Sequence, residues 1–170
     1  MDLQAFKQHI LPVRDKLFRL AKNFLRNREE AEDLLQDVLL KLWTNKQDLD
    51  TYKSVEALAM TTTRNLCLDR LKARKYRRTA DIDGCEIDSG YAAPDQLTEA
   101  ADSESLLQRL LDALPEQQRY VLHLREVEGY SYEEMEELTG LSANNLRVIL
   151  SRARKSMRDG YLKVEAYGAN

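Results

Sequence analysis

Apolar residues recur with the period of an α-helix in the first part of the chain. Four of them form one stripe at i, i+4, i+7 and i+11: Val13, Leu17, Leu20 and Phe24. A second helix is predicted from about Glu29 to Trp43, because apolar residues repeat there and acids crowd its first turns, where they interact favourably with the helix dipole. The polar, unperiodic stretch 44–53 predicts a loop.

A third long helix is predicted after Ser54, which is a good N-cap residue. One of its faces carries Val55, Leu58, Thr62, Leu66 and Ala73, and the opposite face carries Arg64, Leu68, Leu71, Lys75 and Arg78. The stretch 70–78 holds lysines and arginines but no acid. Residues 79–100 then bring acids, glycines and a proline without an apolar period, which predicts a flexible acidic linker.

Helical patterns return over residues 101–159. Leucines at 106, 107, 110 and 111 mark one helix, and Pro115 limits it. Ser131 and Glu134 form a capping box, Gly140 allows a tight turn, and Ser142 caps a last helix. Two short helices joined in this way predict a helix-turn-helix.

Composition supports an all-α fold of two small helical domains. Glycine and proline are scarce, at 6 and 3 of 170 residues, while strong helix formers dominate. No apolar run is long enough to span a membrane, and residues 1–14 lack the apolar centre of a signal peptide. Cys67 and Cys85 have neither metal-ligand nor redox spacing, and Cys67 is expected in the core. We therefore expect a cytoplasmic protein without membrane insertion.

The distribution of charge changes what the net charge implies. A net charge of −3 argues against a nucleic-acid binder. However, residues 1–78 carry an excess of lysine and arginine, residues 79–100 carry acids alone, and residues 101–170 carry a slight excess of acids. A basic module, an acidic linker and a mixed module are physically different objects, so the basic module can still bind DNA.

The outer face of the last predicted helix has the chemistry to read DNA. Asparagine and arginine pair bidentately with base edges, and a valine can contact a thymine methyl group. The residues on this face are Asn144, Asn145, Arg147, Val148, Ser151 and Arg152, and the phosphate-binding candidates Arg154 and Lys155 follow them. Glu136, however, lies where such motifs have a small residue. From the motif alone, a helical hairpin with a solvated basic end is an equal alternative.

Two blocks of sequence resemble the sigma-70 family, specifically its small extracytoplasmic-function group. The first is AEDLLQDVLLKLW at 31–43, followed by TTTRNLCLDRLKARK at 61–75. The second is LPEQQRYVLHLREVEGYSYEEMEELTGLSANNLRVILSRARKSMR at 114–158. The resemblance implies a polymerase-binding and −10-recognising domain 2 at 1–78, an acidic linker at 79–100, and a −35-recognising domain 4 at 101–165.

The resemblance also implies roles for particular residues. Asp33, Gln36 and Asp37 match the surface that binds a coiled coil of the largest polymerase subunit, although a solvated acidic face is the alternative. The loop after Trp43 and the next helix match the region that melts and holds the −10 element. Its candidate DNA-binding residues are Arg64, Arg70, Arg74, Lys75, Arg77 and Arg78. Many relatives have an aromatic near position 57, where this chain has alanine, so the residue that stacks on DNA stays open.

The implied partners are core RNA polymerase, promoter DNA and an anti-sigma factor, and no cofactor is implied. An enzyme is disfavoured because His9 and His123 are isolated, and because no phosphate loop, nucleophile motif or metal spacing is present. His123 is expected in the core. A single-component regulator and a pure interaction module are the other readings. The promoter sequence, the inducing signal and the anti-sigma factor's identity do not follow from the sequence.

Overall fold

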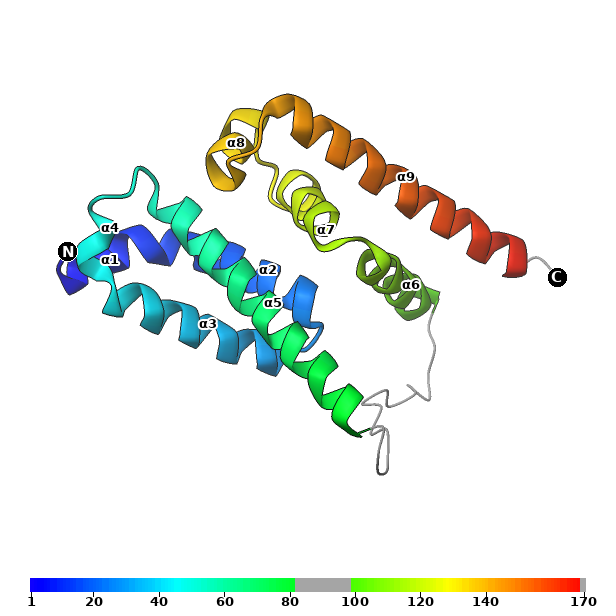
Figure 1. Cartoon of the computed structure of the whole chain (residues 1–170), viewed down its shortest axis with the longest axis horizontal. Helices are drawn as coiled ribbons and strands as arrows, with labels where there is room; N and C mark the ends of the chain where they lie inside the picture. The colour runs from blue at the N-terminus through cyan, green and yellow to red at the C-terminus, as the bar shows by residue number, and fades with distance from the viewer. Residues whose placement is uncertain (82–98, 169–170) are drawn as a thin grey trace.

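The computed structural model of the protein describes residues 1–81 and 99–168, and the regular elements in these ranges are all helices, without a strand. The expected all-α fold is confirmed. The elements are α1 Leu3–Ile10, η1 Leu11–Val13, α2 Arg14–Leu25, α3 Arg28–Thr44, α4 Lys46–Leu49, α5 Val55–Asp81, α6 Glu99–Ala113, α7 Glu116–Leu122, η2 His123–Val127, α8 Tyr132–Thr139 and α9 Ala143–Gly168. Most of the predicted linker lies outside the described residues. Figure 1 shows two helical units side by side, α1–α5 (the N-terminal unit) and α6–α9 (the C-terminal unit).

The N-terminal unit is built on the predicted apolar stripes. The stripe at positions 13, 17, 20 and 24 is buried, and α2 packs with α3 and α5 around it. Ser54 accepts a hydrogen bond from the Ala57 amide at 3.1 Å, as expected of the cap of α5. Cys67 is buried in this core, and burial raises the pKa of its thiol to about 12, so it is an inert packing residue.

Two parts of the N-terminal unit differ from the sequence-based expectation. The stretch 44–53 is not wholly a loop, because it contains the four-residue helix α4, whose Leu49 is only 1% exposed. A single buried leucine fixes this turn, and one residue has no period to detect. Helix α1 was also not anticipated. Asp2 caps it by accepting from the Ala5 amide at 2.8 Å, and it buries Phe6 and Ile10.

The C-terminal unit contains the predicted helix-turn-helix. Ser131 and Glu134 form the capping box of α8, and Gly140 ends α8 with a φ of +73°, a left-handed conformation that glycine adopts without strain. The Glu136 carboxylate accepts a hydrogen bond from the Ala143 amide at 2.6 Å, at the start of α9. An acid at this position therefore caps the second helix of the motif and does not pack between the two helices.

The two units pack against each other through polar contacts, which the sequence did not predict. Arg19 of α2 makes a bidentate ion pair with Glu128, with both N–O distances at 2.8 Å. The side-chain amide of Asn23 contacts His123 at 2.8 Å and accepts from Arg119 at 3.0 Å. Helices α5 and α8 are also in contact. We call this surface, formed by α2 and α5 on one side and by α6 to α8 with residue 128 on the other, the interdomain interface.

Candidate nucleic-acid interface

The outer face of α9 is open to solvent, whereas its inner face is buried. Leu146, Leu150 and Ala153 point into the core of the C-terminal unit. Because the helix has 3.6 residues per turn, the positions on its opposite side face outward. The exposed set comprises Asn144, Asn145, Arg147, Val148, Ser151 and Arg152, all of them predicted −35 residues. The structure thus brings these six predicted residues together on one accessible surface.

Arg147 is held in position within this surface. Its guanidinium lies 4.7 Å from the centre of the Tyr132 ring, and its Nη1 donates to the Asn144 side-chain oxygen at 3.3 Å. A stacked arginine loses less freedom on binding a base than a free one. Tyr132 is therefore a supporting residue that the helix-turn-helix pattern alone does not identify.

The two predicted phosphate-binding residues beyond this face differ in availability. The guanidinium of Arg154 is paired with the Glu126 carboxylate. Lys155 is exposed, and no ion pair involves it within the described parts of the chain. Both side chains follow the base-reading face along α9, but only the charged group of Lys155 is free to bind a phosphate.

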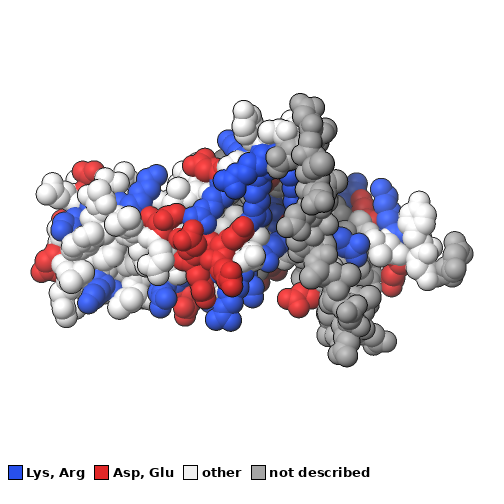
Figure 2. Space-filling model, turned by 90° about the horizontal axis from the view of Figure 1, so that it is seen from below, with Lys and Arg blue, Asp and Glu red and all other residues white. Residues whose placement is uncertain are grey.

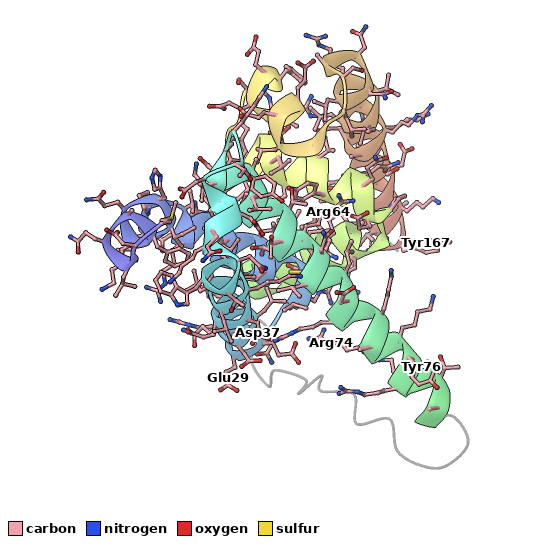
Figure 3. All side chains as sticks on the ribbon, turned by 60° about the vertical axis from the view of Figure 1, so that its left-hand side comes forward. Glu29, Asp37, Arg64, Arg74, Tyr76 and Tyr167 are labelled. Atoms are coloured by element: carbon pink, nitrogen blue, oxygen red, sulfur yellow. The ribbon has the colours of Figure 1, made fainter. Side chains whose placement is uncertain are left out.

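The predicted −10 residues of α5 fall into two groups, of which the first is already engaged with acids. Arg70 contacts Asp33 at 3.0 Å and Asp37 at 2.5 Å on α3. Arg74 pairs with Glu30, also on α3. Figure 3 shows Arg74 between α5 and α3, and Arg64 between α5 and the C-terminal unit.

Arg64 belongs to the interdomain interface. It pairs with Glu116 of α7 and lies 4.8 Å from the centre of the Tyr120 ring. The hydrogen bond to Glu116 raises the pKa of Arg64, so the guanidinium stays charged. In this arrangement Arg64 joins the two units and is not presented to DNA.

The second group lies near the end of α5. Lys75, Arg77 and Arg78 are exposed, and no ion pair is formed by any of them within residues 1–81 and 99–168. The structure therefore divides the predicted −10 residues into two groups. Arg64, Arg70 and Arg74 are paired with acids, whereas Lys75, Arg77 and Arg78 are available to bind DNA. This separation could not be predicted from the sequence, because the pairing carboxylates come from other helices.

Helix α3 carries the predicted polymerase-binding residues on a face of its own. Asp33, Gln36 and Asp37 are all exposed, opposite the buried residues of the same helix. Figure 2 shows acidic side chains gathered on this side of the molecule, with basic side chains next to them. Leu40 lies on the same face one turn further and is 64% exposed. The helical period of the apolar residues did not identify Leu40, since it lies off the core stripe.

His123 and Glu128 are deeply buried titratable residues of the interdomain interface. The Glu128 side chain is only 2% exposed, and His123 Nε2 lies 3.5 Å from its carboxylate. Burial lowers the pKa of His123 to about 4, although Glu128 opposes this shift. His123 is thus neutral near pH 7 and buried as predicted, but it lies between the two units and contacts Asn23 across the interface.

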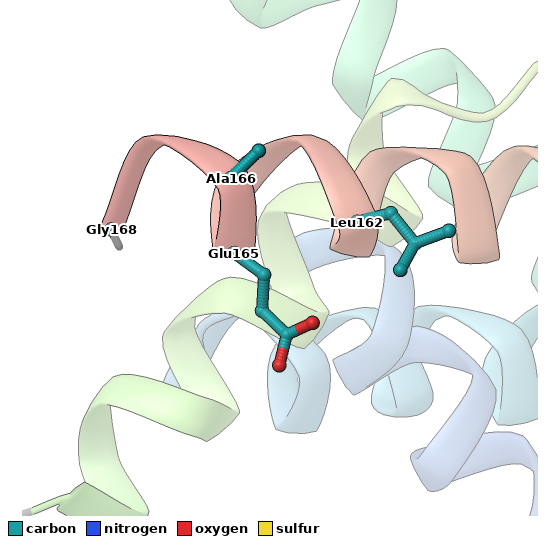
Figure 4. Close-up of a pocket in the computed structure, with 4 residues that line it drawn as sticks. All are labelled: Leu162, Glu165, Ala166 and Gly168. Carbon is teal, nitrogen blue, oxygen red and sulfur yellow. The ribbon is translucent and has the colours of Figure 1, made fainter. Parts of the chain in front are cut away.

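Neither a metal-ligand group nor a membrane-spanning helix is found in the described ranges. Within residues 1–81 and 99–168, no group of three or more histidine, cysteine or acidic side chains is placed to bind a metal ion. In the same ranges, no helix has the length and apolar character needed to cross a membrane. A shallow pocket near the end of α9 is lined by Leu162, Glu165, Ala166 and Gly168, and it presents one carboxylate (Figure 4).

Comparisons with known proteins agree with this arrangement. The family model described as Sigma-70 region 2 matches residues 10–77, and the one described as Sigma-70, region 4 matches residues 104–157. The chain is similar to the ECF RNA polymerase sigma factor SigW of Bacillus subtilis, with 24% identity covering 92% of this chain and 89% of that protein. It is also similar to the ECF RNA polymerase sigma factor SigM of Mycobacterium tuberculosis, with 28% identity covering 95% and 80%.

A solved structure supports the same comparison. It is the co-crystal structure of the sigma factor RpoE in complex with the anti-sigma factor NepR from Bartonella quintana. The TM-score is 0.69 and the identity is 28%, with 95% of this chain and 99% of that chain covered.

Proposed function

The chain belongs to the extracytoplasmic-function group of the sigma-70 family, and from this premise we propose which of its surfaces bind promoter DNA and core polymerase. As a member of this non-enzymatic family, it directs promoter-specific initiation of transcription by RNA polymerase. Its partners are core RNA polymerase and promoter DNA. The domains assigned to these roles are 1–78 and 101–165, joined by 79–100, and the site of action is the cytoplasm, where the polymerase works.

The −35 element is read by the outer face of α9. The single observation that carries this assignment is that Asn144, Asn145 and Arg147 are exposed while Leu146 is buried on the same turns. Such a helix can enter the major groove with its N-terminal residues at the base edges. Val148, Ser151 and Arg152 complete the surface, and Lys155 adds a phosphate contact.

Core polymerase binds the exposed face of α3. Asp33, Gln36 and Asp37 offer polar contacts, and Leu40 adds an apolar anchor on the same face. An exposed leucine among acids suits a partner surface that combines basic and apolar groups. Binding there competes with Arg70 for the two aspartates, so it also releases Arg70 toward the −10 element.

The closed arrangement of the two units has to open for both promoter elements to be bound. Elements centred at −10 and −35 are about 25 base pairs apart, which is about 85 Å of duplex. In the structure α5 contacts α8, and α8 packs against α9. The two DNA-binding helices α5 and α9 are therefore held close together. The covalent connection between Asp81 and Glu99 can extend over about 60 Å, which allows the units to separate. Opening breaks the Arg64–Glu116 pair and frees Arg64.

Transcription from a randomised promoter library with core polymerase tests the assignment. We expect selection of two conserved elements near −35 and −10. Replacing Asp33, Gln36 and Asp37 together by alanine should weaken binding to core polymerase with an unchanged helical circular dichroism spectrum. The matched control is Glu133→Ala with Glu137→Ala, which removes two exposed acids one turn apart on α8. Equal affinity of the triple variant and the control for core polymerase would contradict the surface.

An anti-sigma factor is a further proposed partner. The solved relative RpoE is bound to the anti-sigma factor NepR, and this chain covers 99% of that sigma chain. Capture by a candidate anti-sigma protein should lower promoter-specific transcription and should be reversed by excess chain.

A further inference from the structure

An exposed aromatic side chain lies among unpaired cations at the end of α5. Tyr76 is 78% exposed, although a tyrosine usually buries most of its ring. Lys72, Lys75, Arg77 and Arg78 surround it in sequence and are all exposed. Within the described ranges, none of these four cations takes part in an ion pair. We call residues 72–79 the α5 tip.

The α5 tip differs from the rest of the helix in what its side chains contact. Earlier along α5, Arg70 and Arg74 point toward α3 and are paired with its acids. Tyr76 follows Arg74 by two residues, a rotation of about 200° around the helix, so it faces away from α3. Figure 3 shows Tyr76 near the end of α5, away from both α3 and the C-terminal unit. Its ring is free to receive a partner from solution.

We propose that Tyr76 stacks on an unpaired base of the opened promoter at the −10 element, an inference that rests on the proposed −10 role of α5. Proteins hold single-stranded DNA by combining an aromatic platform with cations along the backbone. Lys75 and Arg77 project on either side of the tyrosine, and Lys72 lies one turn earlier on the same side of the helix. The ring supplies the stacking surface, and these three cations neutralise the flanking phosphates.

This arrangement also offsets the cost of melting. Extruding or unpairing a base costs a few kcal/mol, and a stacking partner on the protein recovers part of the lost base stacking. Position 57 is alanine and the first turns of α5 carry no aromatic residue, whereas Tyr52, 51% exposed, lies in the loop before the helix. Tyr76 supplies one near the other end of the same helix.

The experiment measures binding of the reconstituted holoenzyme to a −10 fork junction whose non-template strand is single-stranded and carries 2-aminopurine. Tyr76→Ala should weaken fork binding by about 5- to 150-fold, the range expected for one stacked base. Tyr76→Phe keeps the ring and should stay within about twofold of the unaltered protein. Tyr167→Ala is the matched control, because Tyr167 is an exposed tyrosine at the end of the other long helix, with an exposed fraction of 85%.

The alternative outcomes separate the possible errors. If Tyr76→Ala binds the fork as well as Tyr167→Ala does, the stacking proposal is wrong while the −10 role of α5 stands. If Tyr76→Phe is as weak as Tyr76→Ala, the hydroxyl group is the contact and stacking is again wrong. If the unaltered holoenzyme fails to bind the fork, the proposed −10 role fails and the stacking proposal fails with it.

Discussion

The two long helices α5 and α9 both carry arginines that the sequence assigns to DNA, but they present them differently. On α9 the base-reading face is exposed, and its Arg147 rests on Tyr132 without a carboxylate partner among the described residues. On α5, Arg64, Arg70 and Arg74 are all paired with acids of other helices. In this closed arrangement, α9 is ready to bind duplex DNA, whereas α5 is ready only at its tip.

The difference shows that the availability of an arginine is decided by tertiary neighbours. An ion pair with a partly exposed guanidinium contributes little to stability, about 0–1 kcal/mol, so it can be exchanged for a phosphate at low cost. The pairs on α5 are therefore suited to be broken when polymerase or DNA arrives. On the base-reading face of α9, binding requires no such exchange, and specificity is preorganised.

The largest expected effect comes from truncating a buried side chain that holds α9 against the rest of the C-terminal unit. Leu146 is fully buried between α9 and the rest of the C-terminal unit, so Leu146→Ala should lower the free energy of unfolding by about 2–5 kcal/mol. Urea-induced unfolding followed by circular dichroism measures this. Val148→Ala, on the exposed side of the same helix, should change stability by less than about 0.5 kcal/mol. Similar losses in both variants would show that α9 is not oriented as described.

A smaller effect is expected from the base-reading face itself. Arg147→Ala should cost about 1–3 kcal/mol of discrimination and relax the preference at one or two base pairs of the −35 element. Selection from a −35 library with the holoenzyme measures the preference at each position. Lys155→Ala is the control and should weaken all sequences alike. Indistinguishable preference profiles for the two variants would mean that α9 does not enter the major groove.

Much of the fold could be predicted because local signals and burial agree. The stripe at Leu17 and Leu20, the cap at Ser54 and the capping box at Ser131 all lie where the structure has them. Helix α4 was missed because it is four residues long and depends on the burial of Leu49 alone. Short elements fixed by one tertiary contact leave no periodic pattern in the sequence.

The residue types of the candidate site could be predicted from the sequence, but the ion pairs that those residues form could not. The sequence identified the residue types on α5 and α9, and the exposed α9 set matches the prediction. It did not identify the acids that hold Arg70 and Arg74, because those acids lie some forty residues away on α3. The partly buried contact between Asn23 and His123 was also missed, since it spans about a hundred residues. Contacts at such separations depend on the packing of whole helices.

Acid should shift the balance toward the open arrangement that frees α5. The pKa of His123 is about 4 in the interface, below its ordinary value of 6.5, because burial disfavours the imidazolium. Glu128 raises this pKa, whereas the charges of Arg19 and Arg119 lower it further. The closed form therefore resists protonation, and its stability falls as pH drops from about 6.5 toward 4. At pH 5.5 the loss should be roughly 1 kcal/mol relative to pH 7.5.

Energy transfer between dyes on α3 and α9 measures this opening as a function of pH. His123→Gln should remove most of the pH dependence between pH 7.5 and 5.5. His9 is exposed, so His9→Gln is the matched control and should leave the dependence unchanged. An unchanged pH profile in the His123 variant would place the cause elsewhere in the interface.

The smallest expected effect distinguishes a paired from an unpaired cation within α9 itself. Lys155→Ala should lower the slope of log K against log salt concentration for promoter binding by about one unit, because one phosphate contact is lost. Arg154→Ala should lower the slope by less, since Glu126 already neutralises its guanidinium. Glu126→Gln removes that carboxylate and should make the Arg154 contribution equal to that of Lys155. If Arg154→Ala and Lys155→Ala lower the slope equally with Glu126 in place, ion pairing in the free chain does not govern which cations bind DNA, and the contrast between α5 and α9 loses its physical basis.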